Sequence, residues 1–169
     1  NLSGDSVGQP EFLDYITERV RGSSVPPEKI CFEITETAAV AELARAVEFI
    51  RTMKEIGCHF ALDDFGSGMS SFAYLKNLPV DYLKIDGHFI RDMGTDVVDR
   101  AMVRSIAQLA QVMGIGTIAE FVETPALLRD LEAMGVGFAQ GYGIARPMPW
   151  EQLLGYWKEA TGEYRRPDI

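Results

Sequence analysis

The fold is decided by residues 39–63, which read AVAELARAVEFIRTMKEIGCHFALD. From Leu43 onward, apolar residues recur at steps of three and four, which predicts an amphipathic helix over residues 39–56. Gly57 follows this helix at the position where a left-handed C-terminal cap forms most easily. Residues 59–63 are a short segment of the kind that predicts a strand. The stretch is therefore a helix that leads directly into a strand.

The same unit recurs along the chain. Four further strands are predicted at residues 30–35, 80–86, 115–120 and 136–140, and a second amphipathic helix at residues 97–113, before Gly114. Strands that alternate with helices predict parallel strands joined by right-handed crossovers, either in an open doubly wound sheet or in a closed (β/α) barrel of the TIM type. A complete barrel has about 250 residues, so this chain would supply about five or six of its eight units.

Composition and charge are those of a single globular domain. Of the 169 residues, 47% are apolar and 24% are charged, which fits one domain with a packed core. No stretch approaches the roughly 20 apolar residues that cross a bilayer, so we expect a soluble, cytoplasmic domain. The net charge of -9 argues against binding to duplex nucleic acid, because that affinity comes mainly from Lys and Arg.

Polar residues gather at the carboxyl ends of the predicted strands. Any one of them alone would be a solvated loop charge, but five strands that end in this way indicate a site, because parallel α/β folds bind ligands at that edge. The residues, strand by strand, are Glu33 and Glu36, Asp63 and Asp64, Lys84 and Asp86, Glu120 and Glu123, and Gln140.

Lys84 is predicted to point into the interior of the fold. In a strand over residues 80–86, Lys84 shares a face with Tyr82 and Asp86, while the aliphatic Leu83 and Ile85 take the other face. A buried ammonium group needs carboxylate partners, and the other strand ends offer them. The alternative is an exposed Lys on an edge strand.

Carboxylates that converge on one pocket repel each other unless cations lie between them. Oxygen ligands suit Mg²⁺ or Mn²⁺, and two such ions about 4 Å apart can hold the attacking and leaving oxygens of a phosphodiester displacement. His59 and His88 are the only histidines and lie on different units, so no zinc cluster is predicted. After Asp63 and Asp64, the glycines around Ser67 suggest a hinge or lid that positions metal ligands.

In order and spacing, several short motifs resemble the EAL domain family of cyclic di-GMP phosphodiesterases. The resemblance runs from Asn1 to about Pro149. The matching pieces are Asn1-Leu2-Ser3, Phe32-Glu33-Ile34-Thr35-Glu36, Asp63-Asp64-Phe65-Gly66, Leu83-Lys84-Ile85-Asp86, Ala119-Glu120-Phe121-Val122-Glu123, Gln140-Gly141-Tyr142 and Arg146-Pro147-Met148-Pro149.

The resemblance implies a (β/α) barrel and a role for each matched residue. Two divalent ions, Mg²⁺ or Mn²⁺, are implied to be held by Asn1, Glu33, Asp63, Asp64 and Glu120. Catalytic roles are implied for Lys84, which orients the attacking water or stabilises phosphate charge, for Glu120, and for Gln140, which helps to order the water network. Loop anchoring or support is implied for Glu36, Ser67, Asp86 and Glu123, and substrate binding for Asp86, Arg146 and Pro147.

The implied reaction is hydrolysis of one phosphodiester bond of cyclic di-GMP to give linear 5′-pGpG. The Glu of the Glu-Ala-Leu motif, itself a metal ligand in the family, belongs on an earlier strand, so we expect residues 1–169 to be a partial domain without its first strands. A catalytically inactive cyclic di-GMP receptor is the alternative function. The resemblance also implies a homodimer in the complete domain and an upstream sensory or GGDEF-type domain, in a parent protein that could be anchored to a membrane.

Overall fold

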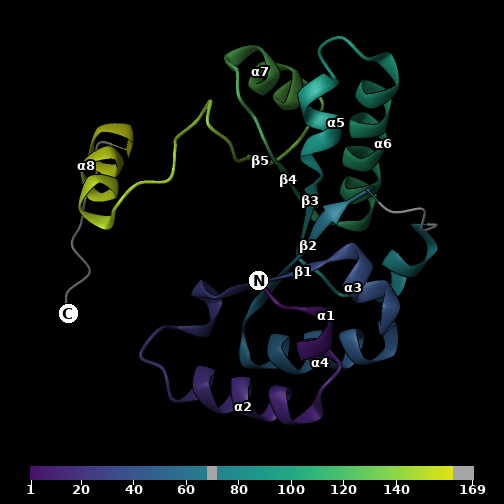
Figure 1. Ribbon diagram of the computed structural model, residues 1–169, viewed down its shortest axis with the longest axis vertical. Helices are drawn as coiled ribbons and strands as arrows, with labels where there is room; N and C mark the ends of the chain where they lie inside the picture. The colour runs from purple at the N-terminus through teal and green to yellow at the C-terminus, as the bar shows by residue number, and fades with distance from the viewer. Residues whose placement is uncertain (68–71, 162–169) are drawn as a thin grey trace.

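The structure, a computed structural model, describes residues 1–67 and 72–161 (Figure 1). Within these residues, five strands form one parallel sheet in which sequential strands are neighbours. The strands are β1 (Cys31–Thr35), β2 (His59–Phe65), β3 (Tyr82–Ile85), β4 (Gly116–Ala119) and β5 (Phe138–Ala139). All five predicted strands are confirmed, and four of them are shorter than expected.

Helices fill the connections between the strands. They are α1 (Gly4–Val7), α2 (Pro10–Arg21), α3 (Glu36–Ala41), α4 (Leu43–Ile56), α5 (Gly87–Asp92), α6 (Val97–Met113), α7 (Pro125–Ala133) and α8 (Trp150–Thr161). Two short 3₁₀ helices, Pro27–Lys29 and Phe72–Asn77, complete the described elements. Helix α4 packs on β2, and α6 packs on β3 and β4. Figure 1 shows α8 lying apart from the sheet.

The strand order decides between the two predicted arrangements. A doubly wound sheet reverses its strand order at a switch point, whereas the strands of a barrel follow one another in sequence. Here the order is β1-β2-β3-β4-β5, with a further parallel bridge from Leu2 to Ile34 beside β1. The sheet therefore has the topology of part of a (β/α) barrel.

The single helix predicted over residues 39–56 is wrong. The chain leaves helical geometry at Glu42, where φ is -129° and ψ is 47°, so α3 and α4 are separate helices. Helix α3 begins directly after β1, and the Thr35 side chain caps it by accepting a hydrogen bond from the Ala38 N–H at 3.3 Å. The predicted left-handed caps are confirmed, since φ is 111° at Gly57 and 71° at Gly114.

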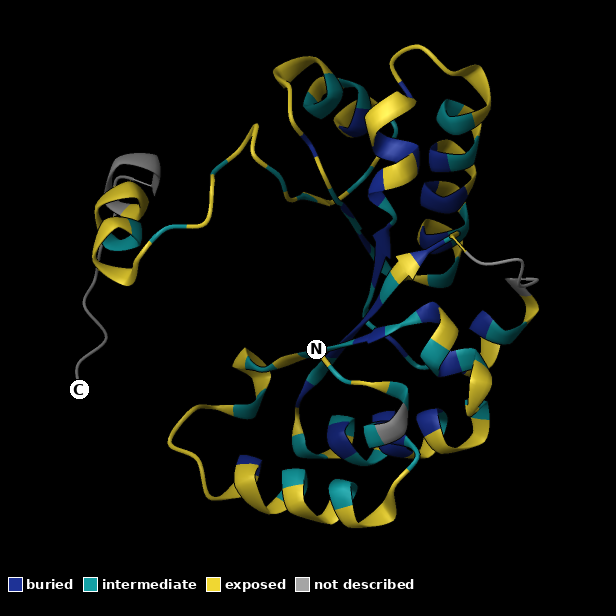
Figure 2. Cartoon of the chain, viewed as in Figure 1, coloured by how far each residue is buried: buried dark blue, intermediate teal, exposed yellow. Residues whose placement is uncertain are grey.

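The core lies between the sheet and its helices, and Figure 2 shows the buried strands along the middle of the molecule. Phe60 and Leu62 on β2 and Leu83 and Ile85 on β3 are fully buried. Burying each such side chain contributes about 1.5–3 kcal/mol, which fixes the strands whose ends carry the polar residues. None of the described helices is long and apolar enough to cross a membrane.

Candidate active site

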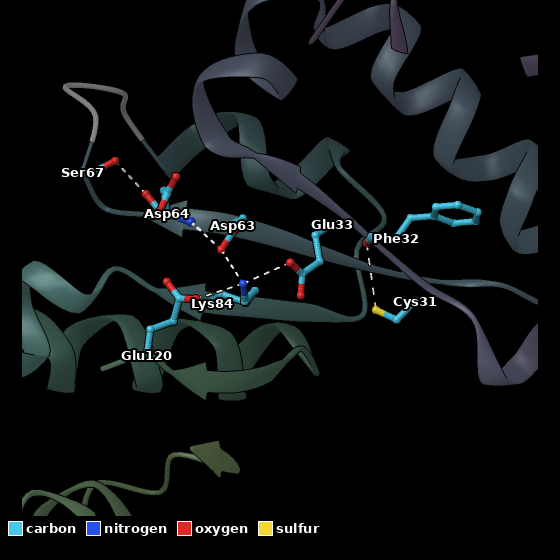
Figure 3. A network of polar contacts seen from close by, with 8 residues as sticks. All are labelled: Cys31, Phe32, Glu33, Asp63, Asp64, Ser67, Lys84 and Glu120. Atoms are coloured by element: carbon cyan, nitrogen blue, oxygen red, sulfur yellow. Dashed lines mark hydrogen bonds and ion pairs between the residues drawn. The ribbon is translucent and has the colours of Figure 1, made fainter. Parts of the chain in front are cut away.

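Lys84 lies at the centre of a carboxylate cluster at the carboxyl ends of the strands (Figure 3). Its Nζ lies 2.8 Å from Asp63 Oδ1, 2.9 Å from Glu120 Oε1 and 3.2 Å from Glu33 Oε2. The residue is only 4% exposed. The alternation of side chains along β3 thus directs Lys84 inward, and the alternative of an exposed Lys on an edge strand is wrong.

Lys84 keeps its positive charge in this setting. Burial alone would lower the pKa of the ammonium group, but hydrogen bonds to Asp63 and Glu120 outweigh it and hold the pKa above its ordinary value. The site therefore contains a fixed cation at neutral pH, surrounded by acidic groups from β1, β2 and the end of β4.

Asp63 and Asp64 are consecutive in sequence, yet both contribute to the same cluster. In a regular strand their side chains would point to opposite faces. The pairing of β2 with β3 shifts register between Leu62 and Phe65, and Asp64 takes a left-handed φ of 54°. The Asp64 N–H donates a hydrogen bond to Asp63 Oδ1 at 3.1 Å. This irregularity turns the second carboxylate back toward the site.

Asp63, Asp64 and Glu120 are arranged so that they could hold a metal ion. Each offers a carboxylate oxygen, and these atoms all lie within 4.8 Å of one another. A set of hard oxygen donors suits Mg²⁺ or Mn²⁺. The residues present therefore fit the class of ion that the sequence predicts.

Two of these carboxyl groups hold their protons more tightly than usual. The pKa of Glu120 is raised by burial and by the nearby Asp63 and Asp64, although Lys84 opposes the shift. The pKa of Asp64 is raised by burial and then by repulsion from Asp63 and Asp86. Crowded carboxylates of this kind favour a bound cation.

Glu36 is buried and ties the segment after β2 to α3. Its Oε2 accepts a hydrogen bond from the Gly66 N–H at 2.9 Å, and its Oε1 accepts one from the Tyr74 hydroxyl at 2.7 Å. Ser67 Oγ donates to the Asp64 carbonyl oxygen at 2.8 Å, closing the turn on itself. These contacts fit the anchoring role predicted for Glu36 and Ser67, which stays a prediction.

Gln140 and Glu123 lie beside the cluster rather than in it. Together with Glu120 they line a cavity of about 260 Å³ whose walls also include Phe121, Gly141 and Tyr142. The backbone of Gln140 is fixed at both ends, because its N–H donates to Ala119 O at 2.8 Å and its carbonyl oxygen accepts from Val122 N–H at 3.0 Å. The cavity adjoins the candidate metal site.

The other predicted residues are more peripheral. Asp86 caps α5 by accepting the His88 N–H at 2.8 Å. Arg146 stacks over the Tyr142 ring at 4.8 Å, and both Arg146 and the following Pro147 are exposed. Asn1 is exposed and stands next to Leu2, whose N–H donates to Glu33 O at 2.7 Å.

Sequence reasoning did not assign a role to Tyr74 or Phe121. Tyr74 lies 38 residues from its partner Glu36, and no local pattern signals that contact. Phe121 follows Glu120 inside a matched motif. Its φ is positive, at 52°, and a Phe in the sequence does not predict this conformation, which bulky residues rarely adopt.

Comparison with known proteins agrees with this geometry. The sequence model of the EAL domain family matches residues 1–147. Over 149 residues the chain is 46% identical to cyclic di-GMP phosphodiesterase PdeB of Shewanella oneidensis. The aligned region is 88% of this chain but only 17% of PdeB.

Solved structures show the same fold. The PaMucR phosphodiesterase in complex with c-di-GMP is 34% identical with a TM-score of 0.85, over 91% of this chain and 62% of that chain. The EAL domain of Mycobacterium smegmatis DcpA is 30% identical with a TM-score of 0.85, over 94% and 71% of the two chains. With its parallel α/β sheet and the family match across residues 1–147, the chain belongs to the EAL domain family.

Proposed function

We propose that this chain carries the catalytic cluster of a metal-dependent phosphodiesterase that hydrolyses cyclic di-GMP to linear 5′-pGpG. The observation that carries the proposal is the buried Lys84 ammonium among Asp63, Glu120 and Glu33, with Asp64 beside them. The name of PdeB and the c-di-GMP complex of PaMucR support the choice of substrate.

Two Mg²⁺ or Mn²⁺ ions are proposed as the cofactors. Asp63, Asp64 and Glu120 would hold them, with Glu33 and Asn1 as further ligands. When bound, such ions neutralise the carboxylates and draw electron density from the phosphate oxygens, which favours attack by water. They also explain how a chain of net charge -9 could bind an anionic dinucleotide.

Lys84 is proposed to stabilise charge during the reaction. As water attacks phosphorus and the bond to the leaving ribose oxygen breaks, negative charge grows on the phosphate oxygens. A preorganised ammonium in a water-poor site is worth more there than in solvent. Glu120 holds Lys84 in place, and Gln140, on the neighbouring strand end, is proposed to order the attacking water.

Substrate binding is proposed for Arg146, Pro147 and Asp86. The guanidinium of Arg146 can pair with a phosphate group, and its stacking on Tyr142 limits its motion next to the cavity. The Asp86 carboxylate can accept hydrogen bonds from a base, and Pro147 offers a rigid apolar surface. Glu36, Ser67 and Glu123 are proposed to support the surrounding loops.

The wider setting of the domain is also a proposal. The chain spans 62% and 71% of the solved EAL chains compared above, which supports the view that residues 1–169 form part of one EAL domain. We propose that the complete domain is a cytoplasmic homodimer, linked to an upstream sensory or GGDEF-type domain. Light scattering on the complete domain tests the dimer.

The test of function is the conversion of cyclic di-GMP to linear pGpG. The complete domain, meaning this chain together with the segment that carries the Glu-Ala-Leu motif, is compared with this chain alone in Mg²⁺, in Mn²⁺ and in excess EDTA. Linear cleavage product is followed by chromatography, with cyclic di-AMP as the control substrate.

The outcomes separate the two candidate functions. Metal-dependent cleavage by the complete domain supports the phosphodiesterase, and EDTA should abolish it. Tight binding of cyclic di-GMP without cleavage in either metal would overturn the enzyme and leave the receptor. If the complete domain neither binds nor cleaves cyclic di-GMP, both functions are excluded.

A further inference from the structure

The backbone turns sharply at Phe121, the residue directly after Glu120. Its φ of 52° is left-handed, and among the described non-glycine residues only Asp64 shares this conformation. A bulky residue holds a left-handed conformation only where its surroundings impose it. At Asp64 the turn brings a second carboxylate to the cluster, and at Phe121 the turn directly follows the Glu120 carboxylate.

Phe121 is 47% exposed, and one side of its ring packs against α5 in a notch left by the absence of a side chain at Gly87. A Cβ atom on Gly87 would lie 2.9 Å from Phe121 Cε2 and closer still to Cγ and Cδ2, which no real side chain tolerates. One helical turn further on, the guanidinium carbon of Arg91 lies 4.1 Å from the centre of the same ring. Positions four residues apart share one face of a helix, so α5 holds the ring at two adjacent points.

The backbone link between β3 and β4 weakens at the same place. Ile85 and Ala119 are their last paired residues, and the next bond, from Glu120 N–H to Ile85 O, is 3.4 Å long. This length is at the limit for a hydrogen bond. Beyond the paired residues, the contact of Phe121 with Gly87 continues the connection between the two strand ends.

Any movement of Phe121 is passed directly to Glu120. The Glu120 carboxylate lies 2.9 Å from Lys84 Nζ and is grouped with Asp63 and Asp64. A misplacement of about 1 Å in such a group can lower a rate by about 10²-fold. A ring that fixes the position of Phe121 therefore also affects Glu120, the residue before it, and through Glu120 the site.

We propose that Phe121 and Gly87 form a matched pair that positions Glu120 in the cluster. Phe121 is a positioning residue, because it acts through Glu120. The pair is matched because a side chain at position 87 and a ring at position 121 cannot share the notch. The inference rests on the proposed function, since the geometry of Glu120 matters through metal binding and turnover.

The test is a double-mutant cycle in the complete domain with Gly87→Ala, Phe121→Ala and both together. Four quantities are measured: the melting temperature, the dissociation constant for Mn²⁺ by calorimetry, and kcat and KM for cyclic di-GMP. Gly94→Ala is the matched glycine control, because an added Cβ there meets nothing within 4 Å. Tyr15→Ala is the matched aromatic control, because its ring also stacks with an arginine, Arg19, at 5.2 Å.

Gly87→Ala should weaken Mn²⁺ binding and lower kcat, each by about tenfold, with a smaller change in KM. It should also lower the melting temperature. Phe121→Ala should weaken Mn²⁺ binding and lower kcat by about threefold each. Phe121→Tyr, which keeps the ring, should resemble the wild type. In the Phe121→Ala background, Gly87→Ala should lower neither Mn²⁺ affinity, kcat nor the melting temperature any further. Without the ring there is no collision, and Ala has a higher helix propensity than Gly.

Additive effects in the cycle would overturn the proposal, as would equal effects of Gly87→Ala and Gly94→Ala or loss of function in Phe121→Tyr. If Gly87→Ala fails to fold, the double variant must fold again, and its failure would also count against the pair. If the wild type is active but the effects in the cycle are additive, this inference is rejected and the proposed function stands. A wild type that neither binds Mn²⁺ nor cleaves cyclic di-GMP rejects the proposed function and the role of the pair with it.

Discussion

The ammonium nitrogen of Lys84 lies 2.8 Å from Asp63 Oδ1, across the carboxyl ends of two adjacent strands. This contact joins the one buried cation of the described residues to the acidic cluster. The contact forms because side-chain alternation on β3 points Lys84 inward, and Asp63 lies near the carboxyl end of the neighbouring β2. The cation and the carboxylates stabilise one another, and the chemistry of the site depends on both.

Lys84→Met should separate the structural from the catalytic part of this contact. Without divalent ions, removing one partner of a buried ion pair should lower the free energy of unfolding by about 3 kcal/mol. Turnover should fall by about 10²-fold or more, since the charge on the phosphate is no longer stabilised. Mn²⁺ should nevertheless bind more tightly, because the carboxylates lose their internal cation.

Urea unfolding, calorimetry and turnover assays measure these three changes, with Lys29→Met, at an exposed position, as the control. Weaker Mn²⁺ binding together with unchanged turnover would contradict the role given to Lys84.

Asp63→Asn should weaken Mn²⁺ binding and lower turnover by about 10²-fold or more, because a neutral amide is a poor ligand for a hard cation. The comparison is with Asp14→Asn on an exposed face of α2. Near-normal turnover in Asp63→Asn would remove Asp63 from the ligand set.

Glu36→Ala should loosen the start of the segment after β2. It leaves the Gly66 N–H and the Tyr74 hydroxyl without their acceptor, at a cost of about 1–3 kcal/mol. Hydrogen exchange at the Gly66 amide should become faster, whereas Glu55→Ala, at an exposed position, should leave it unchanged. Residues 68–71, which continue the hinge or lid predicted after Asp63 and Asp64, lie outside the described residues. Unaltered exchange at Gly66 would show that Glu36 is not the anchor.

The pH dependence of stability should report on Glu120. Its pKa is raised in the fold above the ordinary 4.5, so the folded chain binds this proton more tightly than the unfolded chain. The group therefore adds stability below pH 4.5, and this contribution is lost as the pH rises through the raised pKa.

In EDTA, the free energy of unfolding of the wild type should fall relative to that of Glu120→Gln as the pH rises above 4.5 and through the raised pKa of Glu120. Mg²⁺ should reverse the fall, because it binds the ionised carboxylate. Urea unfolding across this range measures the difference, and a rise with pH in EDTA would contradict the assignment.

Much of this arrangement follows from local sequence patterns. The strands and the caps at Gly57 and Gly114 depend on neighbours in the chain, so periodicity and glycine placement predict them. The inward direction of Lys84 follows from the two-residue period of a strand. The gathering of acids at one edge follows from parallel topology.

The remainder depends on contacts or backbone states that local patterns do not carry. Helical periodicity continues across Glu42, so the sequence pattern does not indicate the break between α3 and α4. Strand alternation places Asp63 and Asp64 on opposite faces, and only the irregular backbone at Asp64 reunites them. The fit of Phe121 to Gly87 joins residues on different strand-helix units and requires the folded shape.

The location of bound Mn²⁺ tests the central claim most directly. Crystals of the complete domain grown with Mn²⁺ can be examined by anomalous diffraction, which identifies the ion independently of activity. We predict Mn²⁺ bound by carboxylate oxygens of Asp63, Asp64 and Glu120, beside the Lys84 ammonium. Mn²⁺ bound elsewhere, or absent from this cluster in an enzyme that still cleaves cyclic di-GMP, would contradict the account.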